Sequence, residues 1–242
     1  IATHLDVKNK FVGASDGREY SYDKLLIATG GEIRSIDEDL RGVCYLRTLD
    51  DADHILQLTT ELGSHTRGVI YGGGFIACEY LNFFAHLNIP TTLIHRGPHF
   101  WSHCLLPETG ALIAQHLRDH GVDLHPNTTL ESLQGDKQLE GIVTNTGEHA
   151  ATILGIGIGI EPDFSWLRDA GVVTNKGVVA NEFLETNAPD VYTAGDIAEF
   201  FDPIVNRQLQ IGNWMNAMSQ GRTVAKSMTG ERTSFQLVSS YA

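Results

Sequence analysis

The sequence has few cysteines and no local pair of them. Cys44, Cys78 and Cys104 lie far apart, and no C-x-x-C motif is present. A zinc ribbon or a dithiol formed within this chain is therefore not expected. The pattern favours a reducing compartment in which the thiols fill small apolar spaces, and we expect a cytoplasmic protein.

Basic residues are also scarce. Lys and Arg number 17 against 30 Asp and Glu, which gives a net charge of −13. With no run of Lys or Arg, the chain is not expected to bind nucleic acid or an anionic membrane surface. No apolar run approaches the roughly 18 residues that span a bilayer, and no secretory leader pattern opens the chain. The 242 residues, 42% of them hydrophobic, can bury the core of one large domain or of two smaller ones.

The middle of the chain is predicted to alternate strands and helices. Hydrophobic periodicity predicts a strand over residues 68–71, a helix over 75–88, a strand over 91–94, a helix over 108–120 and a strand over 122–124. This β-α-β-α-β order is typical of a parallel sheet. Shorter strands follow over residues 128–159, and an apolar strand at 153–160 closes the series. The sequence therefore predicts an α/β fold with a Rossmann-like nucleotide-binding domain.

A glycine-rich turn joins the first strand of this series to its helix. Gly72-x-Gly74-x-x-Ala77 has the spacing of the dinucleotide-binding fingerprint. The first glycine allows the tight turn, the second lets the backbone approach a pyrophosphate, and the small third residue lets the helix pack on the strand. Phe75 and Ile76 begin the helix, whose N-terminus favours phosphate. We expect this turn and these first helical residues to bind the cofactor.

The end of the second strand indicates which nicotinamide nucleotide is held. An acidic residue at this point would hydrogen-bond the ribose of NAD, whereas cationic residues accommodate the 2′-phosphate of NADP. The sequence has His95-Arg96 instead of a carboxylate, and an arginine can bind phosphate through two nitrogens. We therefore expect the chain to bind NAD(P)H, with a weak preference for NADPH. The alternative is that Arg96 is an ordinary solvated surface arginine.

Four segments resemble one family. In chain order they are Tyr22-Asp-Lys-Leu-Leu-Ile-Ala-Thr-Gly30, Leu46-Arg-Thr-Leu-Asp-Asp-Ala52, Gly72-Gly-Gly-Phe-Ile-Ala-Cys-Glu79 and Tyr192-Thr-Ala-Gly-Asp196. Together they are similar to the FAD-dependent pyridine nucleotide-disulfide oxidoreductases, and the second segment is most similar to the ferredoxin-reductase-like branch. The resemblance implies the fold of flavoproteins with two dinucleotide-binding domains.

The resemblance implies a domain map in which an NAD(P)-binding domain is inserted into a partial FAD-binding domain. Residues 1–43 and 161–232 would belong to the FAD-binding domain, residues 44–160 to the NAD(P)-binding domain, and residues 233–242 to the start of a C-terminal interface domain. The first FAD fingerprint and the rest of the interface domain are absent, so the sequence reads as the middle of a longer protein. We expect this chain alone to retain little FAD, and we therefore expect the isolated fragment to be inactive.

The resemblance also assigns roles to individual residues. Thr29 and Gly30 match the family's first crossing strand, and Asp196 matches the aspartate that binds the ribityl chain of the flavin. Trp214 matches an aromatic position near the flavin, although it also begins an apolar helix stripe that is typical of a core. Three further residues match positions near the bound nicotinamide nucleotide: Glu79, Gly157 and Gly159.

The implied function is that of an FAD-dependent NAD(P)H oxidoreductase. Hydride would pass from NAD(P)H to the flavin, and electrons would then pass to an acceptor that is a small protein such as a ferredoxin or a small molecule. The cofactors perform such chemistry, so no catalytic side chain is expected. The alternative is a nucleotide-binding fragment without turnover, or a redox-responsive interaction protein resembling the apoptosis-inducing flavoproteins.

Histidines recur at helical or near-helical spacing without completing a metal motif. His95, His99 and His103 are four residues apart, but Gly97-Pro98 interrupts any helix between them. His116 and His120 are also four apart, without the glutamate of an H-E-x-x-H motif. The sequence therefore predicts no metal site.

Overall fold

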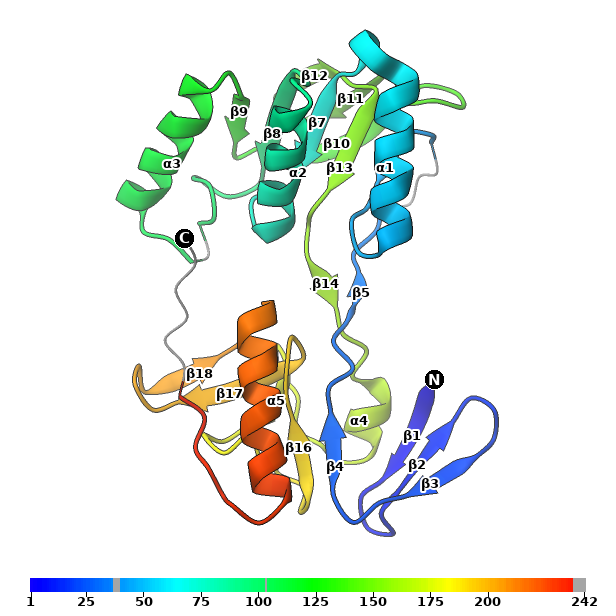
Figure 1. The fold of residues 1–242 in the computed structure, drawn as a ribbon, viewed down its shortest axis with the longest axis vertical. Coiled ribbons are helices and arrows are strands. Elements are labelled where there is room, and N and C mark those ends of the chain that lie inside the picture. The colour runs from blue at the N-terminus through cyan, green and yellow to red at the C-terminus, as the bar shows by residue number, and fades with distance from the viewer. Residues whose placement is uncertain (37–39, 103, 237–242) are drawn as a thin grey trace. The chain divides into compact units, whose positions relative to one another are not determined.

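The computed structural model describes residues 1–36, 40–102 and 104–236, so His103 and the last six residues of the expected interface segment lie outside the described residues. The chain forms two compact units (Figure 1). The first comprises residues 1–32 and the described residues from 161 onward, and the second comprises the described residues between 33 and 160. The first boundary lies at Glu32 and not near residue 43, because Leu40 and Val43 pack into the core of the second unit.

The second unit is built on a parallel sheet of five strands, in the order β6-β13-β7-β8-β9. These strands are β6 (Val43–Cys44), β13 (Ile153–Ile156), β7 (Gly68–Tyr71), β8 (Thr91–His95) and β9 (Asp123–Pro126). Its helices are α1 (Leu49–Leu62), α2 (Phe75–His86) and α3 (Pro107–Asp119), with a short 3-10 turn at Gly63–His65. A separate antiparallel sheet contains β10 (Leu130–Gln134), β11 (Gly141–Thr144) and β12 (Gly147–Ala150).

The two faces of the parallel sheet have different coverings. Ile70 and Leu93 pack with Tyr80 and Phe84 of α2 in one core cluster, whereas the next residue on each strand faces a second cluster that includes Ile142 of the antiparallel sheet. Successive side chains of a strand point to opposite faces. The helices therefore cover one face and the antiparallel sheet covers the other, as the ribbon in Figure 1 also shows.

Helix α1 begins with a capping box at Thr48 and Asp51. The Thr48 hydroxyl accepts a hydrogen bond from the Asp51 N–H, and the Asp51 carboxylate accepts one from the Thr48 N–H. This capping box pairs backbone donors that a helix start leaves without partners. The helix continues to Leu62, and Gly63 follows it.

The described residues of the first unit form three small sheets and two helices. An antiparallel sheet holds β1 (Ala2–Asp6), β2 (Phe11–Ala14) and β3 (Glu19–Ser21); a parallel pair holds β4 (Leu25–Ile27) and β16 (Val191–Thr193); a third sheet holds β15 (Val178–Ala180), β17 (Ala198–Asp202) and β18 (Arg207–Leu209). The helices are α4 (Ser165–Asp169) and α5 (Trp214–Met228). Where the chain passes between the units, β5 (Glu32–Ile33) pairs with β14 (Ile160–Glu161).

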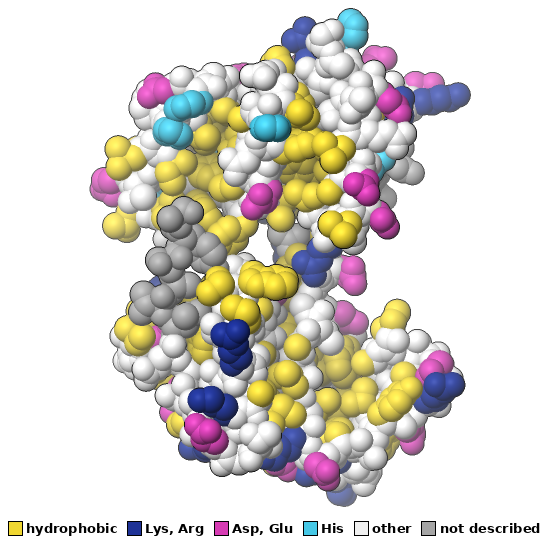
Figure 2. All heavy atoms as spheres, in the orientation of Figure 1, with side chains coloured by type: hydrophobic (Ala, Val, Ile, Leu, Met, Phe, Trp, Pro, Cys, Tyr) yellow, Lys and Arg dark blue, Asp and Glu magenta, His cyan; other side chains and the backbone are white. Residues whose placement is uncertain are grey.

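Helix α5 buries a different face from the one its apolar spacing predicts. Its buried residues are Asn216, Gln220, Val224 and Ser227, whereas Trp214 is 82% exposed. Hydrogen bonds explain the difference, since the Asn216 amide donates to the Ile211 carbonyl and the Gln220 side chain accepts from a loop N–H. Figure 2 shows hydrophobic side chains at the start of α5 and basic ones further along it. Among the described residues, no helix has the length and apolar character needed to cross a bilayer.

Candidate functional site

The glycine turn lies at the carboxyl end of β7, beside the carboxyl end of β13. Gly72 has φ +146°, and a β-carbon built on it would lie 2.2 Å from the carbonyl oxygen of Gly157. The Gly157 N–H donates to the Tyr71 carbonyl at 2.8 Å, which holds the two strand ends together. Glycine at position 72 is therefore required both by its backbone conformation and by the approach of the neighbouring strand.

The next part of the turn is open. Gly74 is the N-cap of α2, and a β-carbon on it would meet no atom within 4 Å. No side chain of the described residues caps this helix start. Phe75 is 40% exposed, and Ile76 packs partly against the core. An uncapped helix N-terminus beside an open glycine is the geometry that accepts a phosphate group.

The two residues at the end of β8 occupy different environments. His95 is 3% exposed, its ring lies edge-on to Phe100 at 6.1 Å between centroids, and its β-carbon lies 3.2 Å from a β-carbon built on Gly73. Burial lowers the pKa of His95, and its Nε2 atom has no hydrogen-bond partner among the described residues. Arg96 is exposed. His95 thus packs against the glycine turn inside the protein, and of these two residues Arg96 is the one exposed to solvent.

Glycines at the end of β13 let α2 lie close to the sheet. A β-carbon on Gly155 would lie 2.8 Å from the ring of Tyr80, whose hydroxyl donates to the Cys44 carbonyl at 2.9 Å. Gly157 lies against Ile76, since a β-carbon there would be 3.2 Å from the Ile76 β-carbon. Gly159 has φ +96°, and a β-carbon there would meet no atom within 4 Å. Helix α2 also carries Glu79, which is exposed.

In the first unit, residues far apart in the sequence meet at the carboxyl ends of β4 and β16. The strands pair in parallel from Leu25 with Val191 to Ile27 with Thr193. The Thr193 hydroxyl and the Ala194 N–H both donate to the Ile27 carbonyl, each at 3.1 Å. The segments that follow, with Thr29 and Gly30 on one side and Asp196 on the other, therefore begin from adjacent strand ends.

Gln220 of α5 supports this second glycine turn, and the sequence analysis missed it. Its Oε1 accepts from the Gly195 N–H at 2.7 Å, while its Nε2 is buried without a hydrogen-bond partner among the described residues. The signal that could have shown it is the four-residue spacing of Asn216, Gln220 and Val224. The amide oxygen of Gln220 accepts a hydrogen bond, but its buried nitrogen donates none to the described residues. A bound ligand could accept that missing hydrogen bond.

Asp196 lies next to Gly195, in the half-buried turn after β16. Its backbone carbonyl accepts from the Gln210 side chain at 3.0 Å, and a β-carbon on Gly212 would lie 3.6 Å from its carboxyl group. Gly30 and Gly195, with φ +61° and +81°, turn the chain at the ends of the two strands. Trp214 begins α5 and is not a core residue, because its side chain is largely exposed.

The two units together define an α/β protein in which each unit has a glycine turn at the carboxyl ends of parallel strands. That arrangement is the architecture of proteins that bind dinucleotides. The chain belongs to the pyridine nucleotide-disulphide oxidoreductase family, which it matches over residues 2–221.

Similar proteins carry reductase names. The chain is 30% identical to a rubredoxin-NAD(+) reductase of Ectopseudomonas oleovorans over 95% of this chain and 60% of that protein. It is 30% identical to putidaredoxin reductase CamA of Pseudomonas putida over 90% of this chain and 53% of that protein. The chain therefore spans little more than half the length of these relatives.

Solved structures show the same fold. The crystal structure of the covalent putidaredoxin reductase-putidaredoxin complex has a TM-score of 0.86 and 28% identity, and the match covers 95% of this chain and 57% of that one. A ferredoxin reductase from Rhodopseudomonas palustris has a TM-score of 0.87 at 22% identity, over 97% of this chain and 59% of that one. These are structures of flavoprotein reductases with two dinucleotide-binding domains, so the predicted fold class is confirmed.

Proposed function

We propose that this chain forms the nucleotide-binding part of an FAD-dependent NAD(P)H reductase that delivers electrons to a small redox protein. The observation that carries the proposal is the pair of glycine turns, one in each unit, at Gly72 and at Gly195. Each follows a strand with a parallel neighbour. The relatives' names, which include rubredoxin and ferredoxin reductases, support a protein as the acceptor.

The nicotinamide nucleotide fits the second unit. The open space over Gly74 and the uncapped start of α2 would receive the pyrophosphate. Gly159, with open space over its α-carbon, would let the nucleotide pass close to the backbone. Glu79 would lie toward the nicotinamide end. These groups orient the nucleotide and require no acid or base from the protein.

FAD fits the residues of the first unit. Asp196 would accept hydrogen bonds from the ribityl hydroxyls, and the unpaired Nε2 of Gln220 would donate to a flavin or ribityl oxygen. Thr29 and Gly30 would line the same crevice from β4, and the exposed ring of Trp214 would cover the flavin from α5. The chemistry that bound FAD supplies is acceptance of a hydride and release of electrons.

Within this proposal, Arg96 favours NADPH over NADH. His95 is buried and cannot contact a ribose phosphate, so the preference rests on the exposed Arg96 alone. An arginine can bind the 2′-phosphate through paired N–H groups. Relatives that are named for NAD(+) make the comparison of both nucleotides the informative experiment.

The first test is flavin reduction. Protein in the presence of excess FAD would be mixed anaerobically with NADH or NADPH, and the flavin absorbance would be followed. We expect bleaching, and weaker FAD binding in a titration of Asp196→Ala than of the control Asp136→Ala, which changes an exposed acid of the other unit. Nucleotide binding without any bleaching of bound flavin would favour the alternative of a non-catalytic module.

The second test separates the two nicotinamide nucleotides by titration calorimetry. Arg96→Ala should weaken NADPH binding by about 1–3 kcal/mol and leave NADH binding unchanged, because a charge-assisted phosphate contact is lost. Arg118→Ala, which removes an exposed arginine from α3, is the matched control and should change neither. Equal losses for both nucleotides in Arg96→Ala would contradict phosphate recognition by Arg96.

A further inference from the structure

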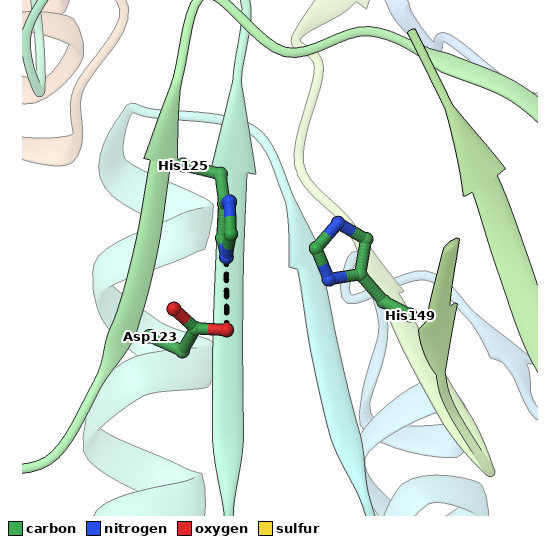
Figure 3. Close-up of side chains that lie close together, drawn as sticks. All are labelled: Asp123, His125 and His149. Atoms are coloured by element: carbon green, nitrogen blue, oxygen red, sulfur yellow. Dashed lines mark ion pairs between the residues drawn. The ribbon is translucent and has the colours of Figure 1, made fainter. Parts of the chain in front are cut away.

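Three potential metal ligands meet in the second unit, on the antiparallel side of its parallel sheet. Asp123 and His125 come from β9, and His149 comes from β12. Each offers one ligand atom, and these atoms all lie within 4.8 Å of one another. Figure 3 shows His149 reaching from its own strand toward the other two side chains.

Strand register explains why these residues converge. Asp123 and His125 are two positions apart on β9, so their side chains point to the same face of the sheet. His149 pairs with Ile142 in the antiparallel sheet, and Ile142 packs in the core cluster between the two sheets. The side chain of His149 therefore points into the space between the two sheets, whereas its chain neighbours are exposed. It faces the side of the parallel sheet that carries His125.

The contacts among the three side chains leave nitrogen atoms without hydrogen bonds. His125 Nε2 and Asp123 Oδ2 form an ion pair at 2.8 Å, drawn as a dashed line in Figure 3, whose geometry is not that of a hydrogen bond. The His125 and His149 rings are 4.6 Å apart between centroids, at 71° to each other. The Nε2 atoms of both rings are buried and have no hydrogen-bond partner among the described residues. Buried polar atoms normally have a partner, and leaving one without a partner is unfavourable.

We propose that Asp123, His125 and His149 bind one divalent transition-metal ion, with Zn²⁺ as the ion that fits best. Two imidazoles and one carboxylate are typical zinc ligands, and three protein ligands leave a further position for water or another group. Imidazole nitrogens favour zinc, copper and nickel over magnesium and calcium, which prefer oxygen.

The geometry needs only small adjustments to hold the ion. Ligand bonds of about 2.0–2.2 Å in a tetrahedral site place the ligand atoms roughly 3.4 Å apart. The Asp123 oxygen must move away from His125 by a few tenths of an ångström, and the Asp123 side chain, 64% exposed, is free to rotate. The farthest pair of ligand atoms, which lies within 4.8 Å, must approach by at most about 1.4 Å to reach this spacing.

The ion would connect the two sheets of the second unit. β9 and β12 belong to different sheets, and neither is a hydrogen-bonded partner of the other. Because an ion that binds only the folded state raises its stability, metal would shift the unfolding temperature of this unit upward. The exposed Asp123 would give the ion a path from solvent.

The test uses protein that carries no histidine tag and has been treated with a chelator. Calorimetric titration with ZnCl₂ and thermal unfolding with and without Zn²⁺ would be measured, and Co²⁺ would report a low-symmetry site through its visible absorption. We expect saturable binding of one ion per chain and a higher unfolding temperature. His149→Gln and Asp123→Asn should each weaken binding at least about ten-fold, since changing even an outer partner of a metal ligand costs that much.

A second histidine pair provides the matched control. The rings of His116 and His120 on α3 are 4.2 Å apart, but His120 Nδ1 is bonded to the His116 carbonyl and both residues are exposed. The double variant His116→Gln/His120→Gln should bind Zn²⁺ as the wild type does. Circular dichroism of His149→Gln and of His125→Gln verifies folding. Absence of saturable binding, or binding that survives His149→Gln and is lost in the control, would overturn the proposal.

Discussion

Replacing Gly72 by alanine should destabilise the second unit and abolish nucleotide binding together. A β-carbon there would lie 2.2 Å from the Gly157 carbonyl oxygen and 2.7 Å from its carbon, and these atoms belong to the backbone. The overlap cannot be relieved by a side-chain rotation, so β7 and β13 must move apart. The φ of +146° is a further cost for alanine.

The magnitude follows from these two effects. A residue with a β-carbon in a disfavoured conformation costs about 1–3 kcal/mol, and overpacking costs about 1–3 kcal/mol. We therefore expect the free energy of unfolding to fall by about 2–6 kcal/mol, a large part of a typical domain stability of about 5–15 kcal/mol. Urea denaturation followed by circular dichroism measures this change.

Gly74→Ala separates stability from binding. Gly74 has φ −133°, which alanine adopts readily, and a β-carbon there would meet no atom within 4 Å. Alanine is a poorer N-cap than glycine, so we expect a stability change within about 1 kcal/mol. The new methyl group would occupy the space expected for the pyrophosphate, so NADH and NADPH affinity should fall more than about ten-fold.

Two results would refute this reasoning. If Gly72→Ala has the same midpoint of urea unfolding as the wild type, the close approach of Gly157 does not restrict the residue at position 72. If Gly74→Ala binds NADH and NADPH with wild-type affinity in calorimetry, the turn does not hold the nucleotide. Loss of stability in Gly74→Ala as large as in Gly72→Ala would also contradict the proposed division of roles.

Three further predictions concern stability and reactivity. Burial raises the pKa of the Cys44 thiol to about 12, so a thiol reagent near neutral pH should label the exposed Cys104 before Cys44, which should react only after denaturation; equal rates in the native protein would contradict this. Burial lowers the pKa of His95, so its contribution to stability is complete above its unfolded-state pKa of about 6.5 and declines as pH falls through the lower folded-state value. His95→Gln should therefore make the fall of unfolding free energy below about pH 6.5 shallower, and an unchanged slope would show that His95 does not titrate as expected. Thr48→Ala should lower the free energy of unfolding by about 1 kcal/mol in urea denaturation, because the capping box of α1 is lost; a change near zero would mean that water replaces the cap.

Local sequence patterns determined most of the elements of the second unit. Apolar spacing predicted β7, α2, β8 and α3, because an amphipathic segment carries its own period whatever it packs against. The glycine turn was also readable, since Gly72 and Gly74 stand between a strand and a helix at the expected spacing. Four ordered motifs then identified the family, and the match over residues 2–221 confirmed it.

Other features depend on contacts between residues that are distant in the chain, and only the tertiary structure decided them. The sequence marks His95 as a strand end, but whether its ring faces solvent depends on Phe100 and Gly73 packing around it. The apolar stripe of α5 predicted the wrong buried face, because the hydrogen bond that the Asn216 amide donates to Ile211 and the one that Gln220 accepts from Gly195 outweigh the stripe.

The constraint on Gly72 and the grouping of Asp123, His125 and His149 have the same origin. The conflict between a side chain at position 72 and Gly157 arises because β7 and β13 are paired, although Tyr71 and its strand partner Ile156 lie far apart in the sequence. Asp123 and His125 share a strand, but His149 joins them only because a second sheet packs on the first. Period and spacing record how a segment folds locally; which segments then face each other is set by the burial of apolar surface over the whole unit.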